Sequence, residues 1–131
     1  MLNRPRLSAA EMEQLRRGVE LFNRGAYWDS HEVWEEIWQQ HGEPWRLFLQ
    51  GLIQTAAALH QHRRGIFHGA VKHLHNARWK LALFPDGFLG IDNLQLQHDV
   101  YESLRRIECA GPQRMRRLEL NWRIAIKEAN E

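Results

Sequence analysis

The chain has little cysteine and no long apolar run, and these two absences exclude several classes of protein. Cys109 is the only cysteine among 131 residues, so an internal disulfide framework is excluded, as is typical of the reducing cytoplasm. No uncharged apolar run approaches about 20 residues, so we expect no membrane-spanning helix. The opening residues MLNRPRLSAAEMEQ lack the apolar core of a signal peptide. The sequence therefore predicts a cytoplasmic protein.

The chain also lacks a strong charge of one sign. Its 18 Lys and Arg residues nearly balance 16 Asp and Glu residues, for a net charge of +2. Such a chain has no overall field that attracts nucleic acid or an anionic membrane. The arginines clustered between positions 105 and 117 are interpreted as a solvated face near a helix C-terminus. Neither nucleic acid nor a membrane is expected as a partner. Phosphate-binding loops, nucleophile elbows and zinc ribbons are missing too.

What is present is a composition typical of one soluble globular domain, with 44% hydrophobic and 26% charged residues. Tryptophan is frequent, with six in the chain. Four of them lie in one short segment: Trp28, Trp34, Trp38 and Trp45. Because aromatic side chains bury the most area per residue, we expect this segment to anchor the core.

The spacing of apolar residues and the residues that start and end helices predict an all-α fold. We expect a single-domain antiparallel bundle of about five helices over residues 1–131. Ser8 followed by Glu11 is a capping box that starts the first helix, and Gly25 ends it. The second helix begins near Trp28 or Asp29 and fades at QHGEP. The remaining helices are expected at 44–64, 67–83 and 92–109. No internal repeat is evident.

Two segments stand out within this plan. Residues 47–61 contain no Asp, Glu, Lys or Arg, so the third helix is expected to be buried all round, at the centre of the bundle. The tail 113–131 contains LELNWRIAIK, which alternates apolar and polar residues like a strand but also fits a helix. We favour the extended form, packed along the bundle or paired with a second copy.

The stretch YWDSHEVWEEIW is the first candidate site. On a helix, Glu32 and Glu36 face water, whereas His31 and Glu35 lie one turn apart at the border of the apolar face. Such a pair can contribute to a metal site or form a hydrogen-bonded pair that raises the pKa of His31. The zinc-protease pattern His-Glu-x-x-His is absent, because position 35 is Glu.

The third and fourth helices supply further candidates. Gln50, Gln54 and Gln61 form a narrow stripe beside Ala57 and Ala58. Buried glutamines need hydrogen-bond partners, so the stripe either faces His31 and Glu35 or pairs with itself and with loop backbone. His60 is placed to complete a site for a divalent metal such as zinc. On the fourth helix, Lys72, Asn76 and Lys80 are expected to face water, and the histidines are expected to be solvated or to pack.

Two motifs carry a family resemblance. FNRGAYWDSHEVWEEIW, followed by FLQGLIQTAAALHQHRRGIFHGAVKHL, resembles the bacterial and archaeal domain-of-unknown-function family 309 over about residues 15–83. The resemblance implies a small cytoplasmic helical protein without an established activity, whose relatives have been labelled metal-dependent hydrolases. It points to the motif residues Asn23, Tyr27, His31, Glu32, Glu35, Gln50 and Gln54. Trp34 stands where Leu is usual.

Three functional hypotheses follow. The first is a half-buried His/Glu/Gln site that binds a ligand or a metal. The second is a metal-dependent hydrolase that uses His31 and Glu35, with a third metal ligand from Glu32 or His60. The third is a homodimeric scaffold protein in which the polar cluster is structural, associating through the tail or the tryptophan-rich helix.

Overall fold

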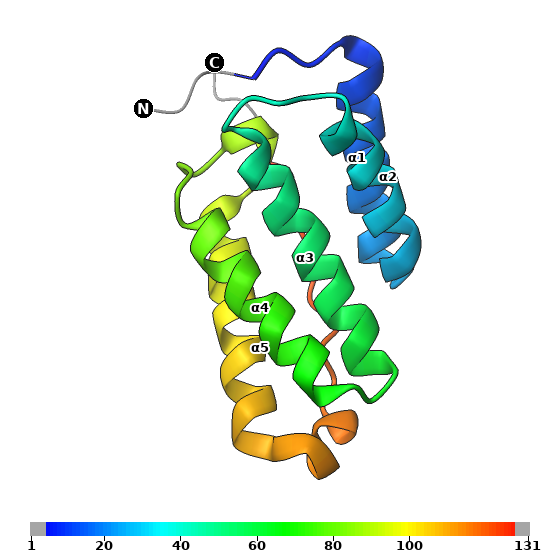
Figure 1. Ribbon diagram of the computed structural model, residues 1–131, viewed down its shortest axis with the longest axis vertical. Helices are drawn as coiled ribbons and strands as arrows, with labels where there is room; N and C mark the ends of the chain where they lie inside the picture. Colours follow the sequence, from blue (N-terminus) through cyan, green and yellow to red (C-terminus); the bar gives the residue numbers. More distant parts are fainter. Residues whose placement is uncertain (1–4, 128–131) are drawn as a thin grey trace.

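The computed structural model describes residues 5–127, which form a bundle of five α-helices (Figure 1). The helices are α1 (Ala9–Asn23), α2 (Tyr27–Gln39), α3 (Arg46–Arg63), α4 (Phe67–Leu81) and α5 (Asn93–Arg114). Two short 3-10 helices, η1 (Phe88–Gly90) and η2 (Met115–Arg117), flank α5. The described residues contain no strand, only an isolated antiparallel bridge between Ile91 and Ile126. The predicted all-α single-domain bundle is confirmed.

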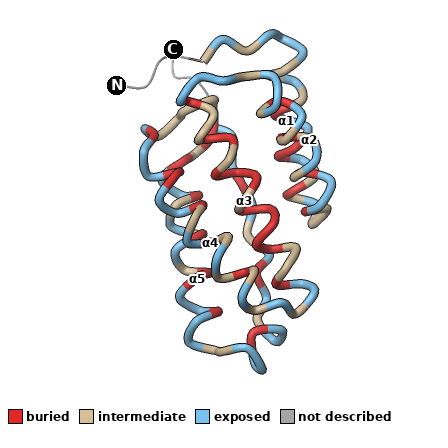
Figure 2. The backbone as a smooth tube through the Cα atoms, viewed as in Figure 1, coloured by how far each residue is buried: buried red, intermediate tan, exposed pale blue. Residues whose placement is uncertain are grey.

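The helices pack in an order that places α3 at the centre. α3 contacts both α2 and α4, while α1 packs on α2 and α5 packs on α4. Figure 2 shows that buried residues run along α3. The prediction of a helix buried all round was too strong, because Gln50, Gln54, His60 and Gln61 remain partly exposed. The reason is that α2 and α4 leave one side of α3 uncovered.

The helix ends follow from local sequence. The capping box is confirmed, because Ser8 Oγ accepts from the Glu11 amide and the Ser8 amide donates to Glu11 Oε1, both at 3.0 Å. Gly25 and Gly65 have φ values of 82° and 77° and end α1 and α3. The amides that follow each glycine return to the preceding turn, Ala26 to the Leu21 carbonyl and Ile66 to the Gln61 carbonyl.

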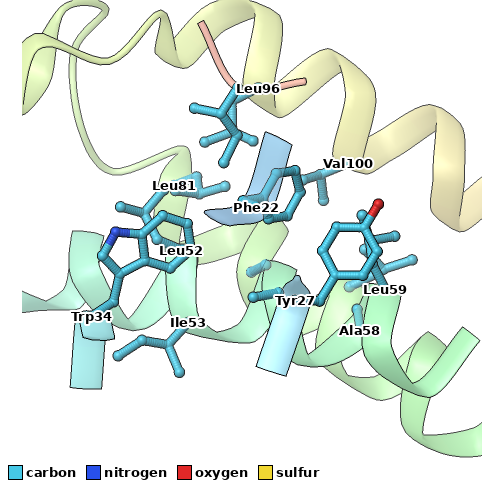
Figure 3. Close-up of a cluster of buried hydrophobic side chains, with 14 of the residues drawn as sticks. Phe22, Tyr27, Trp34, Leu52, Ile53, Ala58, Leu59, Leu81, Leu96 and Val100 are labelled. Carbon is cyan, nitrogen blue, oxygen red and sulfur yellow. The ribbon is translucent and has the colours of Figure 1, made fainter. Parts of the chain in front are cut away.

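The core is built on aromatic and leucine side chains from every helix (Figure 3). Trp34 and Trp45 are almost completely buried, as expected. Trp38 is only partly buried, and the Trp28 side chain is 49% exposed. Not all four tryptophans therefore anchor the core. The difference arises because Trp28 lies at the edge of the α2–α3 contact, where its ring meets the partly exposed His60 rather than apolar core residues.

The last helix and the tail agree with the sequence in part, where the structure describes them. α5 contains a break at Gly111, with φ 80° and ψ 173°, at the AGP where the helix was expected to end. The extended tail was predicted over 113–131, but residues 113–117 are helical, because α5 continues to Arg114 and η2 follows it. Residues 118–127 form no helix, as expected, and residues 128–131 lie outside the described residues. The tail packs along the bundle, with the Trp122 ring 5.2 Å from the Phe22 ring between centroids. None of the described helices is long and apolar enough to cross a bilayer.

Candidate functional site

His31 and Glu35 lie one turn apart on α2, as predicted, at the edge of the surface that packs on α3. His31 Nε2 is 3.8 Å from Glu35 Oε2, and the two side chains are 15% and 39% exposed. That separation is too long for a hydrogen bond, so the pair is a loose electrostatic contact. Glu32 is exposed, in agreement with the helix geometry.

Trp28 connects His31 to the central helix. Its ring stacks on the His31 imidazole, with centroids 4.7 Å apart and planes 10° apart. The same ring lies 5.3 Å from the ring of His60 on α3. Burial lowers the pKa of His60, and the positive charges of Arg64, Arg63 and His31 lower it further. The Trp28 ring therefore lies against both His31 of α2 and His60 of α3.

Gln54 of α3 is joined to Lys80 of α4. Lys80 Nζ donates to Gln54 Oε1 at 2.9 Å. Lys80 is only 7% exposed, and burial lowers its pKa. The expectation that Lys80 faces water was wrong, because its stem turns inward over α3. No carboxylate within residues 5–127 forms an ion pair with it.

His73 is the functional candidate that sequence reasoning missed. It is half-buried on α4, two turns before Lys80. Burial lowers the pKa of His73, as do the charges of Lys72, His31 and Lys80. The seven-residue spacing of His73 from Lys80 was the available signal, since residues that far apart share one helix face.

These contacts define one surface, the polar seam, made by side chains of three helices. Its members are His31, Gln54, His60, Gln61, His73 and Lys80. Gln61 lies against Gly69 of α4, where an added Cβ would be 3.2 Å from Gln61 Cγ. Three buried atoms of the seam have no hydrogen-bond partner among the described residues: His31 Nδ1, Gln61 Oε1 and His73 Nδ1. Gln50 is half-buried one turn before Gln54.

The polar seam does not supply the set of ligands that a metal site needs. In residues 5–127 no group of three or more His, Cys, Asp or Glu side chains is arranged to hold a metal ion. His31, Glu35, His60 and Glu32 therefore do not converge on a common point. A catalytic zinc site needs about three protein ligands, so these residues do not fit one.

Two further motif residues contact the tail. Asn23 Nδ2 donates to the Ile124 carbonyl at 2.9 Å, and Asn23 Oδ1 accepts from the Ile124 amide at 2.7 Å. The Tyr27 hydroxyl lies 3.4 Å from the Leu120 carbonyl. Burial raises the pKa of Tyr27, partly offset by the charge of Arg63. Both side chains help hold the extended tail, and neither belongs to the polar seam.

Comparison with known proteins identifies the segment that carries the seam. Residues 15–73 match the family described as "Domain of unknown function (DUF309)". This segment is a DUF309 domain. The DUF309 domain includes every seam residue except Lys80, and it ends before the tail. The sequence resemblance is thus confirmed, over a shorter range than 15–83.

Similarity to a second protein extends beyond the DUF309 domain. An "Uncharacterized protein" from Aquifex aeolicus (strain VF5) is 29% identical over 119 residues, which cover 90% of this chain and 34% of the relative. The chain therefore spans about a third of the length of the curated relative it matches. Neither comparison states an activity.

Proposed function

We propose that this DUF309 protein is a binding module whose polar seam takes up a small polar molecule. The observation that carries the proposal is the set of three buried, unpartnered atoms on neighbouring helices: His31 Nδ1, Gln61 Oε1 and His73 Nδ1. A buried polar group without a partner costs about 1–3 kcal/mol, and folded proteins leave few of them. Three such atoms on three successive helices are explained if a ligand supplies the partners.

The charged and polar groups of the polar seam indicate which chemical groups the proposed ligand carries. Lys80 is a buried ammonium that contacts the Gln54 amide, and a buried cation is stabilised by an anion or a strong acceptor. Gln61 Oε1 is an acceptor that needs a donor. The ligand we propose therefore carries an acceptor group, such as a carboxylate, towards Lys80 and a hydroxyl or amine towards Gln61. The exposed Trp28 ring offers an apolar surface beside His31.

Metal-assisted hydrolysis by His31 and Glu35 has weaker support. The described residues provide no third ligand that converges with these two. The polar seam, in contrast, needs no metal to account for its buried atoms.

We place the protein in the cytoplasm, since its lone cysteine, Cys109, is exposed and free.

A thermal-shift screen tests the proposal. The full chain is heated with free amino acids, small carboxylic acids and nucleosides, and separately with zinc or manganese chloride. A seam ligand raises Tm, because it binds the folded state alone. His73→Phe removes this shift, whereas His75→Phe preserves it. His75 is a matched control, since it lies on the same helix, is exposed, and pairs with Glu108.

Two results would contradict the proposal. One is a shift that the organic probes produce equally in wild type and His73→Phe. The other is a shift produced by a metal ion alone and abolished by His31→Ala, which would restore the hydrolase hypothesis. Circular dichroism of each variant shows whether the fold is intact before any loss is read as a binding effect.

A second proposal is self-association through α4 and its C-terminal end. Trp79, near the end of α4, and Leu83, in the turn that follows, are 52% and 50% exposed. Large exposed apolar side chains mark interaction surfaces when they cluster. Sedimentation equilibrium is expected to show a dimer that Trp79→Glu dissociates. A monomer mass at all concentrations would reject this role.

A further inference from the structure

A separate pocket lies where the end of α3, the start of α2 and the tail meet. It has a volume of about 400 Å³. None of its lining residues belongs to the polar seam. Its polar lining comes from six side chains: Tyr27, His62, Arg63, Arg116, Glu119 and Asn121.

Arg63 is held in place on one side of this pocket. Its Nη1 donates to the Gly25 carbonyl at 2.6 Å, and its Cζ lies 4.6 Å from the centre of the Tyr27 ring. These contacts use one of the five donors of the guanidinium and one of its faces. The other donors are available in a fixed orientation.

Arg116 reaches the same pocket from η2. Its stem crosses Gly65, where an added Cβ would lie 2.8 Å from the Cδ and Nε atoms of Arg116. Glycine at position 65 therefore serves both the left-handed turn and this close approach. In the part of the chain that the structure describes, no carboxylate forms an ion pair with Arg63 or Arg116. The pocket thus holds two guanidinium groups and the single carboxylate of Glu119.

The C-terminus of α3 lies beside this pocket, and its partial negative charge repels an anion less strongly than that of an uncapped helix end. A helix C-terminus carries a partial negative charge from its free carbonyl groups. At the end of α3 the amides of Arg64, Gly65 and Ile66 donate to the carbonyls of His60, His62 and Gln61. The ring of His62 is held by Met115, with Nε2 2.8 Å from its carbonyl oxygen. The arginines therefore dominate the local charge.

We propose that this pocket binds the oxyanion group, phosphate or carboxylate, of a small organic molecule. Arg63 and Arg116 donate to the oxyanion, since paired guanidinium groups match the geometry of carboxylate and phosphate oxygens. The exposed amide of Asn121 adds a donor at the rim. Glu119 accepts from a hydroxyl or amine elsewhere on the ligand and disfavours polyanions such as nucleic acid.

The test is a titration of the full chain with inorganic phosphate, and separately with acetate, at constant ionic strength. Backbone amide NMR signals of residues 116–121 are followed. Saturable shifts with phosphate or with acetate support the site and identify which oxyanion it prefers. Arg116→Gln is expected to weaken binding about tenfold, whereas Arg117→Gln, next in the chain but outside the pocket, changes it less than about twofold.

Three outcomes would overturn the proposal. The first is the absence of saturable shifts with either anion. The second is an equal loss of affinity in Arg116→Gln and Arg117→Gln, which would show diffuse surface charge. The third is full retention of affinity in Asn121→Asp, which adds a negative charge at the rim without changing the arginines. His31→Ala is expected to leave this binding unchanged, so the result is independent of the polar seam.

Discussion

At the scale of single residues, Gly18 shows how closely α1 and α2 approach. A Cβ placed on Gly18 would lie 2.1 Å from Trp34 Nε1. That nitrogen donates to the Leu15 carbonyl at 3.1 Å, so the indole cannot shift without losing its partner. The helix carries a residue of poor helix propensity here because only glycine admits the tryptophan.

Gly18→Ala is therefore expected to destabilise the fold, although alanine is the better helix former. Overpacking a buried position costs about 1–3 kcal/mol, more than the roughly 1 kcal/mol that helix propensity returns. Urea denaturation measures the difference. Gly42→Ala is the control, because nothing lies within 4 Å of a Cβ at that position. Equal stability of Gly18→Ala and wild type would show that the α1–α2 contact is looser than described.

The histidines of the polar seam make stability depend on pH. The pKa values of His60 and His73 are lowered below 6.5, chiefly by burial. Below pH 6.5 the unfolded chain therefore binds more protons than the folded chain, and the free energy of unfolding falls as pH decreases through the lowered pKa values. Well above pH 6.5 the two histidines are neutral in both the folded and the unfolded chain, so their contribution to the free energy of unfolding no longer changes with pH.

We expect the loss of stability as pH falls below about 6.5 to be smaller in His73→Phe than in wild type, since one titrating group is removed. Urea denaturation at several pH values measures this slope. An unchanged slope in His73→Phe would mean that His73 protonates as readily in the folded chain as in the unfolded one.

At the scale of elements, α1–α2 and α3–α4 are hairpins with matching turns. Gly25 and Gly65 have the same left-handed conformation, and the same pattern of returning amides follows each. Corresponding residues of the two hairpins are 40 positions apart. Several of them differ in type, since Trp34 corresponds to Leu74 and Ser30 to Ala70. The structure thus contains a local repeat that the sequence did not reveal.

The tail is bound to the α1–α2 hairpin through Asn23. Asn23→Ala removes both hydrogen bonds to Ile124 and is expected to cost about 1–3 kcal/mol, because two backbone groups lose their partners. Thermal unfolding measures the cost, and increased proteolysis near residue 124 should accompany it. Asn121→Ala, at an exposed tail position, should be nearly neutral. Equal effects would show that the tail is not held by Asn23.

The sequence predicted the helices well because their ends depend on local chemistry. The capping box at Ser8 and the glycines at 25 and 65 act within a few residues of themselves. Lys80 and His73 could not be placed in this way, because their burial depends on how α4 crosses α3. The same holds for Asn23, whose partner lies 101 residues away. Interactions between distant elements, not local propensity, determined what the sequence missed.

At the scale of the whole molecule, the order of helices creates the polar seam. α3 lies between α2 and α4, so one uncovered side of a central helix is bordered by His31 on α2 and by His73 and Lys80 on α4. A helix at the centre of a bundle is normally covered by apolar contacts. In the binding role that we propose, the glutamines on this side of α3 serve the ligand at some expense to stability.

The most direct test of this account is the free energy of unfolding of Gln61→Met. Methionine has a similar shape but lacks the buried Oε1 that has no partner among the described residues. We predict that Gln61→Met is more stable than wild type by about 1 kcal/mol. Gln14→Met should be less stable, because Gln14 Nε2 donates to the Val33 carbonyl and to Glu36. A Gln61→Met protein destabilised as much as Gln14→Met would show that the polar seam supports the fold and would contradict a binding role.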